Sequence, residues 1–201
     1  MSLDMLRPTQ MTVGLFEVNH KRKKLEALAH HEQQNFLRES PVPAILGPSG
    51  HPYIVDHHHL GRAAAEAKLE GVFVEIISDL SACSPNKFWT EMAAKNWVHP
   101  YNEHGQRCSF EEIPHHLDNL KDDAYRSLAS LVRHAGGYTK TTTPFAEFAW
   151  ADYFRSRMPL VRKSAHISSF VDEAVRLAKL SEASSLPGYT GSTLQKIKVR
   201  K

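Results

Sequence analysis

The alternation of apolar and polar residues in the first half of the chain predicts a strand hairpin, a helix and a further strand. Residues 42–46 and 53–55 are short apolar runs with β-branched side chains, and the segment 47–52 between them has the glycine and proline content of a turn. Four apolar residues then recur at the i, i+3, i+4 and i+7 spacing of one helix face: Leu60, Ala63, Ala64 and Ala67. Gly71 is expected to end this helix, and residues 72–77 predict the next strand.

The junction between the second strand and the helix carries the most distinctive polar residues of the chain. Asp56 is the expected N-cap, because its carboxylate can accept from the N–H groups two and three residues later. His57, His58 and His59 would then lie in the first turn, and Arg62 shares a helix face with His58. A helix N-terminus exposes unpaired N–H groups and attracts anions, above all phosphate. The pattern therefore predicts an oxyanion or phosphate site with Arg62 and one or more of the histidines as donors.

Two other interpretations of the three histidines stay open. Imidazole is a common metal ligand, but neighbouring side chains on a helix point apart, so a metal ion would need a ligand from elsewhere in the chain. The candidates for that ligand are His99, His104, His115 and His116. The plainer alternative is a capped helix whose histidines are solvated on its exposed side.

The length and composition of the chain indicate a globular protein without covalent staples. The 201 residues suffice for one large domain or for one domain with an appended subdomain, and 41% of them are hydrophobic. No apolar run approaches the length that crosses a bilayer, and no signal-peptide pattern opens the chain. Cys83 and Cys108 do not make a disulfide framework, so we expect a cytoplasmic setting without membrane association.

The net charge of +3 is unevenly distributed. The last six residues contain four cations, and residues 20–24 form a second basic cluster. Basic runs can hold phosphate backbones, although runs of this size are more often solvated faces or tails. DNA therefore stays an open partner, and the sequence does not fix the oligomeric state.

The second half of the chain is helical in character. Ser84 and Pro85 give the cap-plus-proline signal of a helix start, and the apolar residues after them follow helical spacing. We therefore expect a core at residues 1–82, a helical subdomain packed on it at residues 83–184, and a flexible basic tail at residues 185–201.

The run Ile54-Val55-Asp56-His57-His58-His59 resembles the ParB-like nuclease family of the ParB/sulfiredoxin superfamily. Members often carry a strand that ends in Val-Asp-Gly-His-His-Arg, followed by a helix, and this turn binds the phosphates of a nucleotide. His57 stands where the glycine is usual, and a residue with a Cβ tolerates fewer turn conformations. The opening Leu6-Arg7-Pro8-Thr9-Gln10, with Gly14 and Glu17, and the segment 97–105 are also similar to a subgroup that carries Asp-His-His-His.

The resemblance implies an α+β fold, in which a small mixed sheet of the ParB/sulfiredoxin type with helices is followed by a helical subdomain. It also implies nucleotide binding, with Mg²⁺ as the accompanying ion. In this scheme Asp56 or Glu17 orients the magnesium or acts as base, and His58 or His59 moves the proton. The residues expected to bind the nucleotide or phosphate are Gln10, His57, Arg62 and Tyr101, the last by stacking on a base.

Three functional hypotheses follow from this resemblance and from the histidine cluster. The first is a phosphotransferase or nuclease acting on phosphate esters, since the family's relatives include a nucleotide-dependent kinase of free serine and proteins called nucleases. The second is a nucleotide-gated module that binds DNA or a partner without turnover. The third is a metal hydrolase that uses the histidine cluster. Sulfiredoxin carries a catalytic cysteine in this turn, and the present chain has none there, which argues against that activity.

Overall fold

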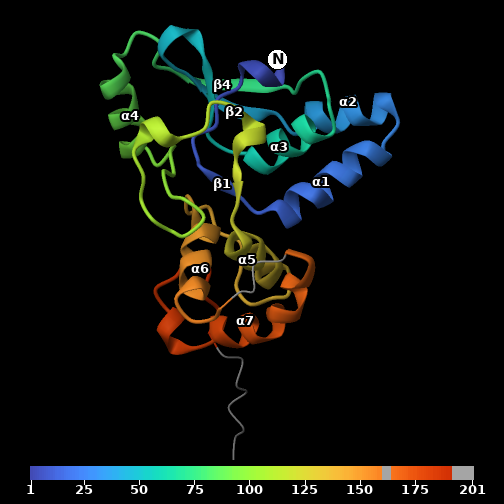
Figure 1. Ribbon diagram of the computed structural model, residues 1–201, viewed down its shortest axis with the longest axis vertical. Helices are drawn as coiled ribbons and strands as arrows, with labels where there is room; N and C mark the ends of the chain where they lie inside the picture. The colour runs from blue at the N-terminus through green and yellow to red at the C-terminus, as the bar shows by residue number, and fades with distance from the viewer. Residues whose placement is uncertain (160–163, 192–201) are drawn as a thin grey trace, which may run out of the picture. The chain divides into compact units, whose positions relative to one another are not determined.

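The computed structural model describes residues 1–159 and 164–191, and the chain divides into two compact units, Met1–Ala124 and Tyr125–Lys201 (Figure 1). The strands and α-helices of the first unit are β1 (Thr12–Val13), α1 (Leu15–Ala27), α2 (His30–Glu39), β2 (Val42–Leu46), β3 (Pro52–Ile54), α3 (His58–Glu66), β4 (Val74–Asp79), α4 (Pro85–Ala94) and β5 (Lys121–Asp122). The α-helices of the second unit are α5 (Ala124–His134), which begins at the boundary, α6 (Ala146–Arg155) and α7 (Val171–Ala178). Small sheets with helices in the first unit, followed by the helices of the second, confirm the α+β class.

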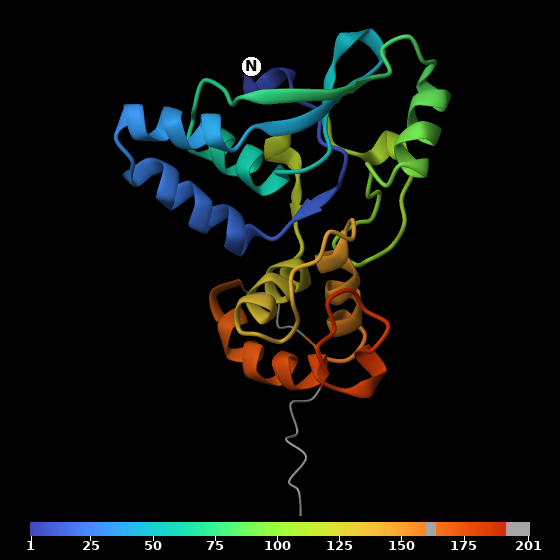
Figure 2. The ribbon, with the colours of Figure 1, turned by 180° about the vertical axis from the view of Figure 1, so that it is seen from behind.

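The main sheet of the first unit has the strand order β3-β2-β4. Strands β2 and β3 are antiparallel, with Ala44 opposite Ile54, so the predicted hairpin is confirmed. Strand β4 pairs with β2 in parallel and forms the other edge of this sheet, as Figure 2 shows from behind. A second, two-stranded sheet pairs β1 with β5 in parallel. The hairpin thus delivers the end of β3 directly to the start of α3.

The structure buries three of the four residues of the apolar face predicted for α3, and the fourth, Ala67, is the partly exposed C-cap. Leu60, Ala63 and Ala64 are at most 4% exposed and belong to a core that also contains Ala44 of β2 and Val18 of α1. The small alanine side chains let the helix approach its neighbours closely, and each buried methylene contributes about 0.8 kcal/mol.

Helix α3 ends at Glu66, so the prediction that Gly71 ends it is wrong. Lys68 takes a left-handed backbone conformation with φ of 56°, and the Leu69 N–H donates to the Ala64 carbonyl at 3.0 Å, which closes the helix end. Gly71 has a different function, because a Cβ there would lie 2.3 Å from the Met1 carbonyl oxygen. Because Gly71 has no side chain, Met1 can pack closely against the segment that leads into β4.

The boundary expected near residue 82 falls inside the first unit, because a second core joins the segments on either side of it. The buried residues of this core are Met11, Ile45, Phe88, Met92, Val98 and Ile113. Ser84 is the N-cap residue of α4, and Pro85 is its first residue, as the sequence predicts.

The second unit packs its helices around Trp150 of α6, which is fully buried. The ring of Trp150 stacks on Tyr138 with centroids 4.3 Å apart, and its Nε1–H donates to the Pro187 carbonyl at 2.7 Å. The Thr139 N–H also donates to the Gly188 carbonyl at 2.9 Å. Pro187 and Gly188 of the expected tail are therefore hydrogen-bonded within this unit, and residues 192–201 lie outside the described residues. In the ranges that the structure describes, no helix has the length and apolarity needed to cross a bilayer.

Candidate functional site

The turn between β3 and α3 takes its shape from His57. This residue has a left-handed backbone with φ of 62° and ψ of 23°, and it is the N-cap of α3 without a side-chain hydrogen bond to the helix. The expected N-cap, Asp56, lies one residue earlier and instead accepts the His57 N–H at 2.6 Å. The prediction of Asp56 as the cap is wrong because the left-handed residue, which sets where the helix begins, is His57. The turn therefore has the conformation that glycine adopts at low cost, although a histidine occupies it.

His58 points into the protein and accepts a backbone hydrogen bond. His58 is 4% exposed, and its Nε2 accepts the Thr9 N–H at 3.1 Å. Burial lowers the pKa of His58 to about 3, with His59, His57 and His99 lowering it further, while Asp56 opposes the shift. His58 is therefore neutral at cellular pH, and its proton is on Nδ1 because Nε2 acts as the acceptor.

His59 makes an equivalent bond one residue further along α3. Its Nε2 accepts the Gly14 N–H at 3.0 Å, and the Glu17 Oε2 lies 3.8 Å from the same nitrogen. The carboxylate of Glu17 also lies 3.8 Å from the Lys21 Nζ. The structure thus brings together Glu17 and His59, two of the residues for which the resemblance implied separate roles. The proton-transfer role of His58 and His59 stays a prediction, and their observed contacts are with the backbone of the N-terminal segment.

Arg62 extends toward residues 117–120, which include the short 3₁₀ turn Leu117–Asn119. Its Nη1 donates to the carbonyls of Leu117 and Leu120 at 3.2 Å each and also to the Asp118 carbonyl. Its Nε donates to Glu66 at 2.7 Å, and the side chain is 15% exposed. These bonds hold the guanidinium to the protein, while its predicted role in phosphate binding stays a prediction.

Gln10 and Tyr101 lie on two segments that run side by side. Gln10 forms a parallel bridge with His99, and the His99 N–H donates to the Thr9 carbonyl at 2.8 Å. The ring of His99 stacks on Tyr101 with centroids 4.6 Å apart, and Gln10 donates from Nε2 to the Thr12 carbonyl at 2.8 Å. Because Thr9 bonds both the His99 N–H and the His58 Nε2, this stacked pair is close to the histidine turn. We call residues 99–101 the aromatic wall.

Thr9 is the residue that sequence reasoning missed. It bonds His58 through its N–H, the aromatic wall through its carbonyl, and the end of β3 through its hydroxyl, which donates to the Ile54 carbonyl at 2.8 Å. The available signal was its place directly before Gln10 in the opening segment.

The metal site that the sequence left open as an alternative has no counterpart in residues 1–159 and 164–191, where no three histidine, cysteine or acidic side chains are grouped to hold an ion. His104 lies beside Glu103 at 3.8 Å, and His115 and His116 are exposed. The interpretation as a histidine-cluster metal hydrolase therefore has no geometric support from the described part of the chain.

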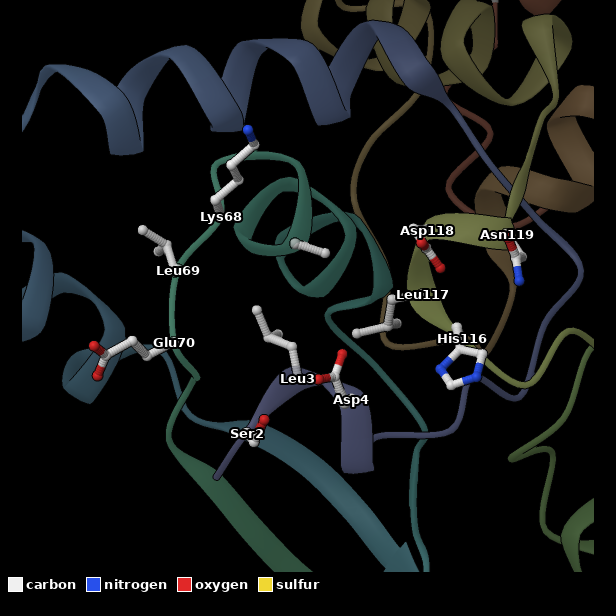
Figure 3. A pocket seen from close by; sticks show the side chains of 11 residues that line it. Ser2, Leu3, Asp4, Lys68, Leu69, Glu70, His116, Leu117, Asp118 and Asn119 are labelled. Carbon is white, nitrogen blue, oxygen red and sulfur yellow. The ribbon is translucent and has the colours of Figure 1, made fainter.

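A hollow of about 550 Å³ lies at the other end of α3, around the residues that follow it (Figure 3). It is lined by Ser2, Leu3, Asp4, Ala65, Lys68, Leu69, Glu70, His116, Leu117, Asp118 and Asn119. Of the candidate residues only His116, a candidate metal ligand, is among them, and the hollow's polar side chains are exposed. This hollow is therefore separate from the histidine turn.

The left-handed conformation of His57 gives a direct prediction for stability. His57→Gly should raise the free energy of unfolding by about 1 kcal/mol, because glycine has no Cβ to strain this backbone. His57→Ala keeps the Cβ and should bring no such gain. Urea denaturation measures the difference, and Lys68→Gly, which relieves another positive φ away from the turn, is the positive control. A gain from Lys68→Gly without one from His57→Gly would contradict the assignment of strain to His57.

Comparison with known proteins places the chain among proteins of related sequence and structure. A family model with the description "Putative ParB-like nuclease" matches residues 1–156. The crystal structure of protein Atu1540 from Agrobacterium tumefaciens is similar, with 38% sequence identity and a TM-score of 0.88, over 96% of this chain and 95% of that chain. No curated protein matches the sequence.

Proposed function

The chain belongs to the ParB-like nuclease family, and from that premise we propose that it binds a nucleotide or another phosphate-bearing molecule at residues 56–59. The observation that carries this proposal is the left-handed His57 at the uncapped start of α3. A left-handed residue followed by helical residues turns successive N–H groups toward one point, which is an arrangement that binds anions. The helix dipole adds positive potential at the same point.

The ring of His57 supplies a second argument. Its Nδ1 is buried and has no hydrogen-bond partner within the described residues. A strained backbone and an unpaired polar atom each cost free energy, and both are typical of functional sites. A bound phosphate would give this nitrogen an acceptor when the ring carries a proton there.

The division of roles among the turn residues favours His57 and Asp56 as the groups that meet the ligand. The Nε2 atoms of His58 and His59 are already bonded to backbone amides, whereas Asp56 is exposed. In a phosphotransferase or nuclease, Asp56 would orient or deprotonate the attacking hydroxyl or water, and His57 would neutralise charge on the phosphate. A Mg²⁺ ion arriving with the nucleotide would add charge neutralisation, with Asp56 or Glu17 as its carboxylate ligand.

A second candidate function is a nucleotide-binding module without turnover, with DNA or a protein as partner. The specific observation in its favour is that two of the three histidines make backbone contacts instead of facing the proposed ligand. Chromatographic measurement of nucleotide conversion and of DNA cleavage, at saturating nucleotide, separates the two candidates. Turnover in either assay that Asp56→Asn abolishes supports the enzyme, while nucleotide binding without turnover in both assays supports the module.

The proposal predicts that a nucleotide stabilises the protein. In a thermal-shift panel of nucleoside mono-, di- and triphosphates, with and without magnesium, we expect at least one ligand to raise the Tm, since ligand at 100 times its Kd adds about 2.7 kcal/mol. His57→Ala should reduce this shift because it removes the ring beside the phosphate. His30→Ala, an exposed histidine at the start of α2, is the matched control and should leave the shift unchanged. A panel in which no ligand moves the Tm at millimolar concentration would refute the proposal.

A further inference from the structure

The histidine turn and the aromatic wall are joined by one residue of the N-terminal segment. Thr9 gives its N–H to His58, its hydroxyl proton to the last residue of β3, and its carbonyl to the N–H of His99. These bonds use all three polar groups of the residue, and Thr9 is 1% exposed. Any movement of Thr9 therefore also moves the segment that carries His99 and Tyr101.

His58 and His59 fasten the same segment at two points. The bonded amides are those of Thr9 and Gly14, so Gln10 lies between the two anchors and Glu17 follows in the first turn of α1. The Thr9 hydroxyl oxygen lies 3.4 Å from the His58 Nε2, which is farther than the Thr9 amide nitrogen. This hydroxyl instead donates to the Ile54 carbonyl. Both imidazoles thus act as acceptors, which a protonated ring could not do at Nε2.

We infer that His58 and His59 are positioning residues: as neutral acceptors, they fix the N-terminal segment on α3 and, through Thr9, hold the aromatic wall beside the ligand site. This inference rests on the proposed function for the ligand, but the attachment of the N-terminal segment to α3 through the two histidine hydrogen bonds does not. It assigns the three consecutive histidines to different tasks. His57 meets the phosphate, while His58 and His59 hold Gln10, Glu17 and the wall in place.

The experiment combines NMR spectroscopy with binding of inorganic pyrophosphate. In the wild-type protein at neutral pH, the ¹⁵N shifts of His58 and His59 should show a protonated Nδ1 and an unprotonated Nε2. His58→Ala should speed hydrogen exchange of the Thr9 and His99 amides by about 10-fold or more and weaken pyrophosphate binding by about 10-fold. His58→Gln, whose side-chain oxygen can accept in place of Nε2, should restore both to within about threefold of wild type.

The matched control is His57→Ala, which should weaken pyrophosphate binding and leave exchange of the Thr9 amide unchanged. A proton on Nε2 of His58 in the wild-type protein would overturn the inference, and this measurement needs no variant that might misfold. An unchanged Thr9 exchange rate in folded His58→Ala would overturn it as well. If the tautomers and exchange rates are as expected but the protein binds no pyrophosphate, the positioning role of His58 and His59 is supported. Only the proposed function is then contradicted.

Discussion

Arg62→Ala is expected to lower the free energy of unfolding by about 3 kcal/mol, because it removes the donor of several partly buried, charge-assisted hydrogen bonds. The guanidinium donates to three backbone carbonyls of residues 117–120 and to the Glu66 carboxylate. Leu117 and Leu120 are at most 3% exposed, so their carbonyls have little access to water as a substitute. Urea denaturation should show a lower midpoint with an unchanged m-value.

The matched control for this prediction is Arg22→Ala. Arg22 also pairs with Glu66, at 3.6 Å, and with Glu26 at 3.1 Å, but its side chain is 32% exposed and it bonds no backbone carbonyl of the described residues. Pairs of this kind contribute about 0.2–1 kcal/mol, so the loss should be small. Arg62→Lys should fall between wild type and Arg62→Ala, since an ammonium cannot reproduce the planar fork of donors. Equal losses in Arg22→Ala and Arg62→Ala would contradict the anchoring role of Arg62.

The same result bears on how a binding defect of Arg62→Ala should be interpreted. The sequence places Arg62 four residues after His58 on one helix face, which suggests a phosphate contact. In the structure the guanidinium bonds carbonyls that are 55 and 58 residues away along the chain. Weaker nucleotide binding in this variant would therefore reflect a direct contact only if Arg62→Lys, at a temperature where both variants are folded, shows a defect of similar size.

Local sequence patterns predicted the elements around the site because their causes are local. The hairpin follows from two β-branched runs and a turn of glycine and proline, and the buried face of α3 follows from the spacing of Leu60, Ala63 and Ala64. The end of α3 did not follow, because a lysine, Lys68, adopts the left-handed conformation that is usual for glycine. The prediction that Gly71 ends the helix was wrong because this glycine is required for another reason. It allows the close approach of Met1, which is distant in sequence.

The candidate site was predictable in its location and less so in its internal contacts. Residues 56–59 do lie at a strand-to-helix turn, as the pattern indicated. The partners of His58 and His59, however, are 49 and 45 residues earlier in the chain, and no periodicity encodes such a pairing. The left-handed backbone of His57 also sets where the helix begins, and a residue other than glycine seldom adopts this conformation.

The second large expected effect is a loss of folding stability at acidic pH, and it follows from the neutral state of His58. The pKa of His58 falls from its ordinary value of 6.5 to about 3 on folding, chiefly through burial. Below pH 6.5 the unfolded chain binds a proton that the folded protein excludes, so this group's contribution is fully present above pH 6.5 and is lost as pH falls toward 3. At 1.36 kcal/mol per pH unit, the loss between pH 6.5 and pH 4 is about 3 kcal/mol.

The measurement is urea denaturation of wild type and His58→Gln between pH 4 and pH 7.5. Glutamine accepts the Thr9 amide without titrating, so the variant should lack this part of the acid sensitivity while keeping the part that arises from carboxylates. The titratable neighbours of His58 are Asp56, His57, His59 and His99, and all four are present in both proteins. The free energy of unfolding of wild type relative to His58→Gln should therefore be constant above pH 6.5. Below pH 6.5 it should fall by about 1.36 kcal/mol per pH unit, the slope for one proton. Parallel curves over the whole range would show that His58 accepts its proton in the folded protein, and would contradict its burial as a neutral acceptor.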